Sequence, residues 1–329
     1  MKQFTLQILC CRTNSQSGSR MEISMKYIAG ETDFKIKNSA VSLGKFDGIH
    51  LGHQLLLNKV LELKKDGLQA VMFTFLYNPR NLFSDKEIEL IYTEEEKRYI
   101  LEQSGFDVLV SYPFTKETAS MEPVDFIKEV LIEKLDAKVI VVGADYCFGH
   151  NRRGNVELLK EKSKEYGYEL IVFDKIKVQD QVISSSYIRS KIAEGDIELV
   201  TRLLGRPFSI IGEVKHGRKI GRTIGFPTVN LIPPASKLLP PDGVYASMTS
   251  INGIKYPGLT NIGHNPTVGV TPEKRVETYI FDFDSDLYGS TIEVSLYAYE
   301  RPEMSFQSVE ELKNQMNQDI IYGRKYFSK

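Results

Sequence analysis

The sequence contains no tryptophan, only three cysteines and no long apolar run. Two of the cysteines, Cys10 and Cys11, are adjacent, so the three form neither a disulfide framework nor the spacing of a zinc site. A reducing, cytoplasmic location is therefore expected. The apolar stretches are much shorter than the roughly 20 residues that a membrane-spanning helix needs, so we expect no membrane association.

An excess of charge of either sign is also missing. The 329 residues carry a formal net charge of -1, and their lysines and arginines are mixed with glutamates. We therefore expect no nucleic-acid partner and no broad electrostatic attraction, so that any phosphate is bound locally. A chain of this length is long for one domain and sufficient for two, and we expect a monomer or weak self-association.

What the sequence does contain is a set of histidines in loops rich in glycine or proline. All five lie in such loops: His50, His53, His150, His216 and His264. Glycine lets backbone N–H groups approach a phosphate, and a nearby imidazole or basic side chain adds a hydrogen bond or charge. Two of these clusters lie far apart in the chain, which predicts two phosphate-handling sites.

The first half alternates between short apolar runs and helical patterns. The runs that we predict as strands are residues 40–44, 71–75, 107–111, 138–143 and 169–173. Helices are predicted after Tyr92, where T-E-E-E provides an N-cap and acidic first turn, and from Asn155 to Tyr166. This alternation predicts an α/β domain of Rossmann-like type, with a parallel sheet, helices on both faces and ligands at the carboxyl ends of the strands.

The loop G-K-F-D-G-I-H-L-G-H lies between a predicted strand and a predicted helix. Gly44 and Gly48 permit a tight turn, and Gly52 keeps side-chain bulk away from the helix start. His50 and His53, three residues apart, can then both face a phosphate at the helix N-terminus. The alternative is that the two histidines only cap the helix.

This stretch resembles a known family. H-L-G-H is similar to the H-x-G-H signature of adenylyl-transferring nucleotidyltransferases, and the whole loop resembles the bacterial bifunctional riboflavin kinase/FAD synthetase family. G-A-D-Y-C-F-G-H-N-R-R-G and I-S-S-S-Y-I-R are similar to further family segments, and the resemblance extends from about Met21 to the C-terminus. It implies an enzyme that uses ATP and Mg²⁺.

For the first half, the resemblance implies a set of ATP-binding residues. His50 and His53 would contact the phosphates, Arg189 would hold the triphosphate with Ser185 and Ser186, and the remaining nucleotide-binding residues would be Gly44, Phe46, Asp47, Gly48, Gly52, Asn78, Phe148 and Gly149. Two departures stand out, because Ser186 replaces a usual threonine and Asn78 a usual histidine. Asn78 can form hydrogen bonds but cannot carry a proton charge, so we expect an effect on the efficiency of adenylyl transfer.

The second half has a different residue pattern, with strand-like runs and few helical segments. Strand-like runs follow Arg206-Pro207, Asn252-Gly253 predicts a hairpin turn, and only residues 308–327 are helical in pattern. These features predict a small antiparallel β-barrel with a terminal helix. The predicted organisation is a flexible extension (1–20) that translation from Met21 or Met25 would omit, a nucleotidyltransferase domain (21–190), a helical linker (191–205) and a riboflavin kinase domain (206–329).

The second glycine-rich loop, H-G-R-K-I-G-R-T-I-G-F-P-T-V-N, is not a Walker A motif but resembles the G-F-P-T-x-N signature of riboflavin kinases. The resemblance implies Thr228 and Asn230 as Mg²⁺ ligands and Glu277 as the base for the ribityl hydroxyl. The residues expected to bind ATP or flavin are His216, Gly217, Arg218, Gly221, Arg222, Gly225, Phe226, Pro227, Tyr245 and Asn261. The flavin is expected between the loop of residues 261–267 and the terminal helix.

The predicted function is therefore flavin cofactor synthesis in two steps. Riboflavin and ATP would give FMN in the second domain, and FMN and ATP would give FAD and pyrophosphate in the first. One alternative is a riboflavin kinase whose nucleotidyltransferase domain is weak, lost, regulatory or directed at another acceptor. Another is a flavin-sensing or interaction protein, against which the presence of both signatures argues.

Overall fold

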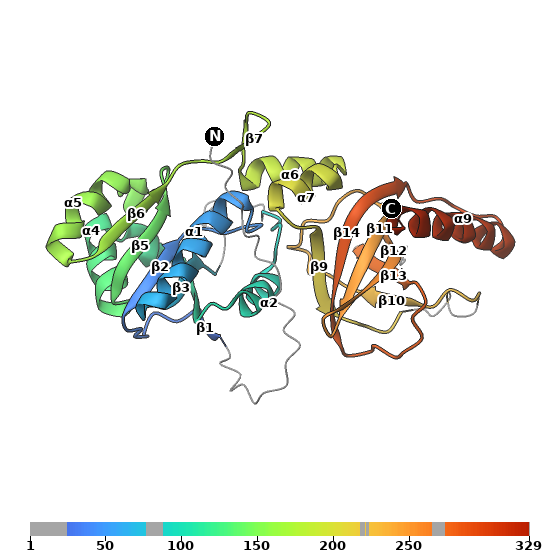
Figure 1. Ribbon diagram of the computed structural model, residues 1–329, viewed down its shortest axis with the longest axis horizontal. Coiled ribbons are helices and arrows are strands. Elements are labelled where there is room, and N and C mark those ends of the chain that lie inside the picture. The colour runs from blue at the N-terminus through green and yellow to red at the C-terminus, as the bar shows by residue number, and fades with distance from the viewer. Residues whose placement is uncertain (1–24, 77–87, 218–220, 222–223, 265–273, 329) are drawn as a thin grey trace. The chain divides into compact units, whose positions relative to one another are not determined.

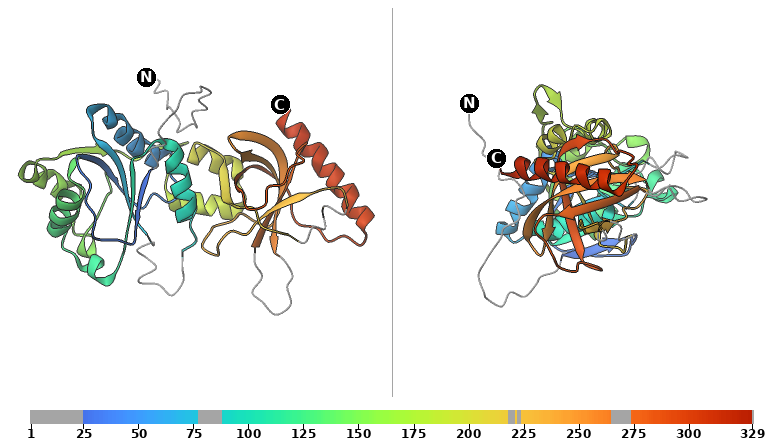
Figure 2. Two further views of the ribbon diagram at one scale, coloured as in Figure 1. Left: turned by 90° about the horizontal axis from the view of Figure 1, so that it is seen from below. Right: turned by 90° about the vertical axis from the view of Figure 1, so that its right-hand side faces the viewer.

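The computed structural model describes residues 25–76, 88–217, 221, 224–264 and 274–328, which form two compact units. The first unit takes its residues from the chain up to Ile88 and from 97–184. The second takes 89–96 and 185–329, so that α2 (Glu94–Ser104) is divided between the two. Figures 1 and 2 show that each unit has its own sheet.

The first unit contains a six-stranded parallel sheet. Its strands lie in the order β1-β4-β3-β2-β5-β6, and every neighbouring pair is parallel. The strands are β1 (Lys26–Ala29), β2 (Ser39–Leu43), β3 (Gln69–Phe75), β4 (Val108–Tyr112), β5 (Ala137–Gly143) and β6 (Glu169–Phe173). The five predicted strands are confirmed within a residue or two, and β1 is an edge strand that the sequence pattern did not indicate.

Helices cover both faces of this sheet. Val41, Phe73 and Ile140 point to the face covered by the π-helix η3 (Phe126–Lys134) and by α5 (Val156–Tyr166). Helix α1 (Leu51–Glu62) lies against β2, β3 and β5 and takes no part in that cluster, as expected for the opposite face. The predicted α/β class is thus confirmed. The shorter elements are η1 (Leu63–Asp66), α3 (Lys116–Ser120), α4 (Pro123–Asp125), η4 (His150–Arg152), β7 (Lys177–Val178) and β8 (Gln181–Val182).

The second unit is an antiparallel barrel with helices. Its strand order is β10-β13-β12-β11-β14-β9, and a backbone bridge between Lys215, just after β9, and Asn230 in β10 joins the two edges. The predicted barrel with a terminal helix is confirmed. The elements are α6 (Ser185–Glu194), α7 (Ile197–Leu204), β9 (Phe208–Glu213), β10 (Thr228–Leu231), β11 (Gly243–Ile251), β12 (Ile254–His264), β13 (Lys274–Ile280), β14 (Thr291–Arg301) and α9 (Val309–Phe327).

Local signals in the sequence explain several boundaries in this unit. Asn252 (φ 49°) and Gly253 (φ 81°) form the left-handed turn between β11 and β12. Ser308 begins α9, because its side chain accepts a hydrogen bond from the Glu311 backbone N–H at 3.1 Å. Helix α9 then packs on the outer face of the barrel, where Gly323 lies against Phe281 and Leu259.

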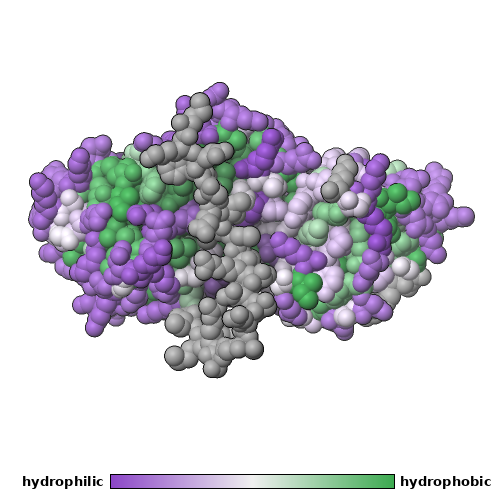
Figure 3. Space-filling model, viewed as in Figure 1, coloured by the Kyte–Doolittle hydropathy of each residue, from purple (hydrophilic) through white to green (hydrophobic). Residues whose placement is uncertain are grey.

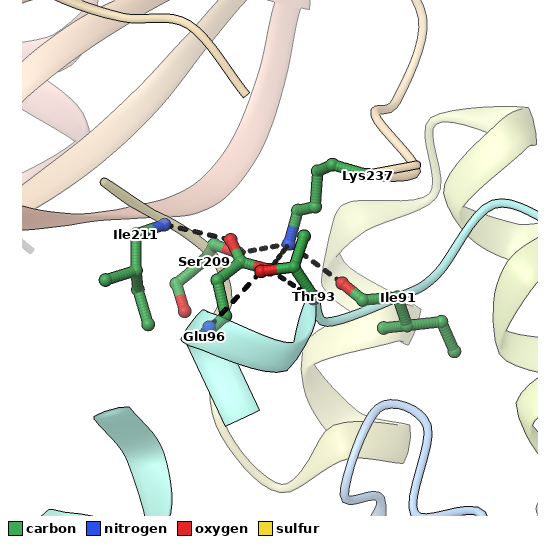
Figure 4. Close-up of polar contacts among 6 residues, drawn as sticks. All are labelled: Ile91, Thr93, Glu96, Ser209, Ile211 and Lys237. Atoms are coloured by element: carbon green, nitrogen blue, oxygen red, sulfur yellow. Dashed lines mark hydrogen bonds and ion pairs between the residues drawn. The ribbon is translucent and has the colours of Figure 1, made fainter. Parts of the chain in front are cut away.

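A buried ion pair connects residues 89–96 to the rest of the second unit (Figure 4). Lys237 Nζ donates to Glu96 Oε2 at 2.7 Å and to the backbone oxygens of Ile91 (2.8 Å) and Ser209 (2.9 Å). The second carboxylate oxygen of Glu96 accepts from the Ile211 backbone N–H at 2.9 Å. The charges of the pair are therefore satisfied by hydrogen bonds from several directions, as burial requires.

The described surface is mixed in character. On the face shown in Figure 3, hydrophilic residues surround small groups of hydrophobic ones. Among the residues that the structure describes, no helix combines the length and the apolar composition needed to cross a membrane.

Candidate active sites

The strand order of the first unit identifies the edge where a ligand is expected. Strands β3 and β4 lie on one side of β2, and β5 and β6 lie on the other, so the order reverses between β2 and β5. In open α/β sheets, ligands bind beyond the carboxyl ends of the strands at such a reversal. The two loops that begin there are residues 44–50 after β2 and residues 144–155 after β5.

The first of these loops brings His50 and His53 into direct contact. His50 is the N-cap of α1, and its Nδ1 accepts a hydrogen bond from the His53 backbone N–H at 3.3 Å. The two rings stack with centroids 3.7 Å apart. A Cβ on Gly52 would lie 3.2 Å from the His50 ring, so the glycine leaves space for this stack. One histidine therefore does cap the helix, and the pair also remains together at the strand ends.

The turn that leads to the histidines has an unusual backbone. Phe46 (φ 46°) and Ile49 (φ 42°) are in the left-handed region although neither is glycine, and both side chains are buried. Hydrogen bonds to β3 fix the turn, because Thr74 Oγ1 donates to the Lys45 carbonyl and the Gly44 N–H donates to the Phe73 carbonyl. Such strain is uncommon and is concentrated at ligand-binding sites.

Burial determines the charge of the two histidines. Burial lowers the pKa of His50 to about 4. It also holds the pKa of His53 well below the usual range, and the positive charge of Lys97 and any proton on His50 act in the same direction. Both imidazoles are therefore neutral at pH 7. His53 Nδ1 is buried without a hydrogen-bond partner among the described residues, so the pair has capacity to bind a ligand.

The loop after β5 is held in a tight turn at residues 148–154. Phe148 and Gly154 exchange two backbone hydrogen bonds, and the Phe148 ring packs in the core against Phe126 and Tyr146. Gly149 has a φ of 68°, and a Cβ there would lie 2.7 Å from the Pro123 ring. The expectation that Phe148 and Gly149 shape a nucleotide pocket stays a prediction, in which the backbone of this loop would form the contacts.

The other predicted ATP-binding residues are placed as follows. Asp47 is buried and Gly48 has a φ of 86° within the turn. Ser185 and Ser186 begin α6 in the second unit, and Arg189, one turn further along, donates from Nε to the Glu89 carbonyl at 3.1 Å. Asn78 lies outside the described residues.

In the second unit, strand register brings the predicted catalytic residues together. Asn230 on β10 is paired with Glu277 on β13, and Glu277 is paired with Asn261 on β12. Side chains of directly opposed residues lie on the same face, with Cβ atoms about 5 Å apart. Asn230, Glu277 and Asn261 therefore form a row across the outer face of the barrel, which we call the polar row. Thr228 lies two residues before Asn230 on the same face.

Two described glycines before β10, Gly217 and Gly221, pack beside this row. Asn230 is only 6% exposed, and its Oδ1 is buried without a hydrogen-bond partner among the described residues. A Cβ on Gly217 would lie 2.5 Å from Asn230 Nδ2, so only glycine fits at that position. A Cβ on Gly221 would lie 2.3 Å from the Phe226 carbonyl oxygen and 3.6 Å from Thr228 Oγ1, so this position also requires glycine. A buried, unpartnered amide oxygen beside a hydroxyl fits a hard cation such as Mg²⁺.

Three comparisons with known proteins agree with this geometry. The FAD synthetase family model matches residues 33–187, and the riboflavin kinase family model matches residues 204–327. Relatives named bifunctional riboflavin kinase/FMN adenylyltransferase are 39% identical over 310 residues in Buchnera aphidicola and 38% over 296 residues in Bacillus subtilis. The alignments cover 92% of this chain and 99% of the Buchnera protein, and 88% and 93% for Bacillus.

The chain belongs to the bifunctional riboflavin kinase/FMN adenylyltransferase family. It is therefore a transferase with two enzymatic domains, as the sequence predicts, and the family's reactions use ATP. The Escherichia coli member is 35% identical over 290 residues, covering 87% of this chain and 92% of that protein.

A solved structure shares the fold of this family member along nearly its whole length. It is titled a macrolide-efflux protein from Streptococcus pneumoniae, and it has a TM-score of 0.78 and 32% identity. The match covers 92% of this chain and 99% of the other. The efflux role belongs to that title alone, whereas both family models and the curated relatives indicate flavin transferases.

The remaining predicted kinase residues lie around the polar row or away from it. Gly225 (φ 92°) and Pro227 are exposed, the Phe226 ring contacts Tyr279, and His216 lies 3.8 Å from the Tyr288 ring. Tyr245 faces the barrel interior, opposite to the row, and its hydroxyl donates to the Pro241 carbonyl at 2.5 Å. Its flavin contact stays a prediction. Arg218 and Arg222 lie outside the described residues.

Sequence reasoning missed several polar groups near the row. Glu303, just after β14, accepts a hydrogen bond from Asn261, and Asp242 contacts His264 at 2.7 Å and Lys274 at 2.9 Å. Burial opposes ionisation of Asp242, but the hydrogen bonds from Lys274 and His264 hold its pKa below the usual value. No local pattern marks these pairs, because their members come from separate strands and loops.

Proposed function

We propose that the two sites divide flavin cofactor synthesis between them. The second unit would transfer the γ-phosphoryl group of ATP to riboflavin, giving FMN and ADP. The first unit's histidine pair would then serve adenylyl transfer from ATP to FMN, giving FAD and pyrophosphate. The observation that carries this proposal is the polar row, because strand register aligns a metal-ligand candidate, a carboxylate and an amide beside a glycine-rich loop.

In the kinase step, Glu277 acts as the general base. It removes the proton of the ribityl hydroxyl while that oxygen forms a bond to the γ-phosphorus and the bond to the ADP oxygen breaks. Thr228 Oγ1 and Asn230 Oδ1 would hold Mg²⁺, which when bound offsets charge on the phosphates. Gly217 and Gly221 have no side chain that could displace a metal ion or a phosphate from Asn230 and Thr228.

In the adenylyl step, the attacking group is the FMN phosphate, which needs no base at neutral pH. One of its oxygens forms a bond to the α-phosphorus, and pyrophosphate leaves. The neutral His50 and His53 can donate hydrogen bonds to the phosphates at the N-terminus of α1, where the helix dipole favours an anion.

The proposal includes the cellular setting expected from the sequence. The enzyme would act in the cytoplasm on riboflavin, FMN and ATP, without nucleic acid, as a monomer or with weak self-association. The net charge of -1 supports the absence of a nucleic-acid partner, since it provides no general attraction to a polyanion.

Paired variants test the division of labour. In the full-length Glu277→Gln protein, we expect FMN formation from riboflavin to fall by about 100-fold or more, because a missing general base typically costs that much. FAD formation from supplied FMN should be unchanged, and His53→Asn should show the reverse pattern. Chromatography of the flavin products measures both activities.

The matched control is Asp284→Asn, which neutralises an exposed carboxylate close to β13 in the chain. Undiminished FMN formation by Glu277→Gln would show that another group is the base. FMN that accumulates in the unmodified protein without FAD would instead favour a kinase with a weak or lost adenylyltransferase.

A further inference from the structure

The polar row continues beyond Asn261. Asn261 Nδ2 donates to Glu303 Oε1 at 3.1 Å, although the two residues are 42 positions apart in the chain. Gly263 lies on the same strand as Asn261, and any Cβ at Gly263 would collide with the Glu303 carboxylate. Glu303 therefore lies directly on the backbone of β12, at the end of the row opposite to Asn230.

The backbone segment that carries Glu303 is firmly held. Arg301 donates from Nε and Nη2 to the two carboxylate oxygens of Asp319 in α9, at 3.0 and 2.6 Å, and Asp319 is only 4% exposed. Arg301 Nη1 also donates to the Pro302 carbonyl at 2.9 Å. The position of Glu303 is thus set by a buried ion pair two residues earlier, whereas its own side chain is exposed.

The spacing of the side chains along the row can be compared with the length of riboflavin, which consists of a ribityl chain attached to a flavin ring. Neighbouring strands lie about 4.8 Å apart, so Asn261 is about 5 Å beyond Glu277 and about 10 Å beyond Asn230. When the ribityl hydroxyl is at Glu277 with the phosphates on the Asn230 side, the ribityl chain leads along the row. A flavin ring at the far end of that chain would then lie toward Asn261 and Glu303.

We propose that Glu303 and Asn261 recognise the pyrimidine edge of the flavin ring. That edge has an N–H group between two carbonyls, while an ionised carboxylate only accepts hydrogen bonds and an amide N–H donates. Glu303 accepts from the ring N–H, and Asn261 donates to an adjacent carbonyl. This inference rests on the proposed kinase function and makes Glu303 a specificity-determining residue for the flavin substrate.

The test uses riboflavin and 3-methylriboflavin, in which a methyl group replaces the ring hydrogen that Glu303 would accept. Full-length protein is assayed with ATP and Mg²⁺ for kcat/KM, and flavin fluorescence titration gives the dissociation constant of each flavin without turnover. We expect the unmodified protein to prefer riboflavin by about tenfold or more, as is typical of a hydrogen bond to a charged group.

In Glu303→Ala, the preference for riboflavin should fall to near one, through a higher KM for riboflavin and an unchanged KM for ATP. Glu303→Gln, which keeps an acceptor oxygen, should retain part of the preference for riboflavin. Glu310→Gln, an exposed glutamate in the first turn of α9, is the matched control and should keep all of it.

The two possible failures are distinguishable. Equal preference for riboflavin in the unmodified protein and in Glu303→Ala, in turnover and in binding, would overturn the role of Glu303. A purely structural effect of the substitution would weaken both flavins alike and leave the ratio unchanged, which also counts against it. Absence of FMN formation in the unmodified protein would contradict the kinase proposal, while the binding ratio would still decide the recognition of the ring.

Discussion

At the scale of single residues, the histidine pair shows how burial sets chemistry. His50 and His53 stack at 3.7 Å, a distance at which two imidazolium ions would repel each other. Burial lowers the pKa of His50 to about 4 and lowers that of His53 as well, so both rings are neutral at pH 7. Neutral imidazole can donate or accept a hydrogen bond, and it can also take up a proton when an anion arrives.

This predicts proton uptake on ATP binding. The triphosphate favours the protonated form of any nearby imidazole, so the pKa values of His50 and His53 should rise and protons should be taken up at pH 6 to 7. Calorimetric titration of ATP into the full-length protein in buffers of different ionisation enthalpy measures the number of protons. His50→Asn keeps a helix cap and should reduce the uptake, while an unchanged number in His50→Asn and His53→Asn would contradict the assignment.

At the scale of elements, β14 and α9 are joined by charges that sit close together. Glu300 on β14 is half-buried next to Asp319 on α9, and its Oε2 has no hydrogen-bond partner among the described residues. Burial first, and then the negative charge of Asp319, raise the pKa of Glu300 to about 7 despite the opposing effect of Arg301. The contact between the terminal helix and the barrel thus contains a carboxyl group that ionises near neutral pH.

Stability should respond to this group with a definite sign. The folded-state pKa of Glu300 is about 7 and its ordinary value is 4.5, so between these limits the native state binds more protons than the unfolded state. The free energy of unfolding should therefore fall as the pH rises from about 5 to 8. Denaturant titrations at several pH values should show a smaller decrease for Glu300→Gln. An identical pH profile for Glu300→Gln and the unmodified protein would rule out this contribution.

At the scale of the whole molecule, the two compact units do not coincide with the residue ranges that the two family models match. Residues 89–96 fall within the FAD synthetase match, yet they pack in the second unit with residues 185–329. Hydrogen bonds of Leu90 to Ser236 and Leu238, together with the Glu96–Lys237 pair, attach them there. We propose that the kinase domain includes this segment, which a fragment beginning at Arg206 would lack.

Loss of the buried charge pair should destabilise the second unit. In Glu96→Gln, Lys237 would keep a buried charge without its carboxylate, and we expect a loss of about 3–5 kcal/mol in the free energy of unfolding. Denaturant unfolding of the full-length protein, followed by loss of kinase activity, measures this change. Glu95→Gln, an exposed neighbour, is the control. Equal midpoints for the two variants would show that the pair contributes little.

Much of the fold was predictable because it depends on neighbouring residues. Asn155 and Ser308 begin their helices, Gly205 ends α7 in the left-handed region, and Asn252-Gly253 turns the chain between two strands. The strand and helix periods in the first half follow from which side chains are apolar. The glycine loops and their histidines were visible for the same reason, since turns and helix starts are specified within a few residues.

The rest depended on contacts between distant parts of the chain. β1 has four residues and β10 follows a proline, so neither carries a strong local pattern, and pairing with other strands stabilises both. By itself the sequence determined the classes of the two domains and their candidate loops. Only the tertiary structure decided that Asn230, Glu277 and Asn261 share one row, that Glu303 extends it, and that Glu96 meets Lys237, because strand register and buried charge pairing are set by the packing of the whole domain.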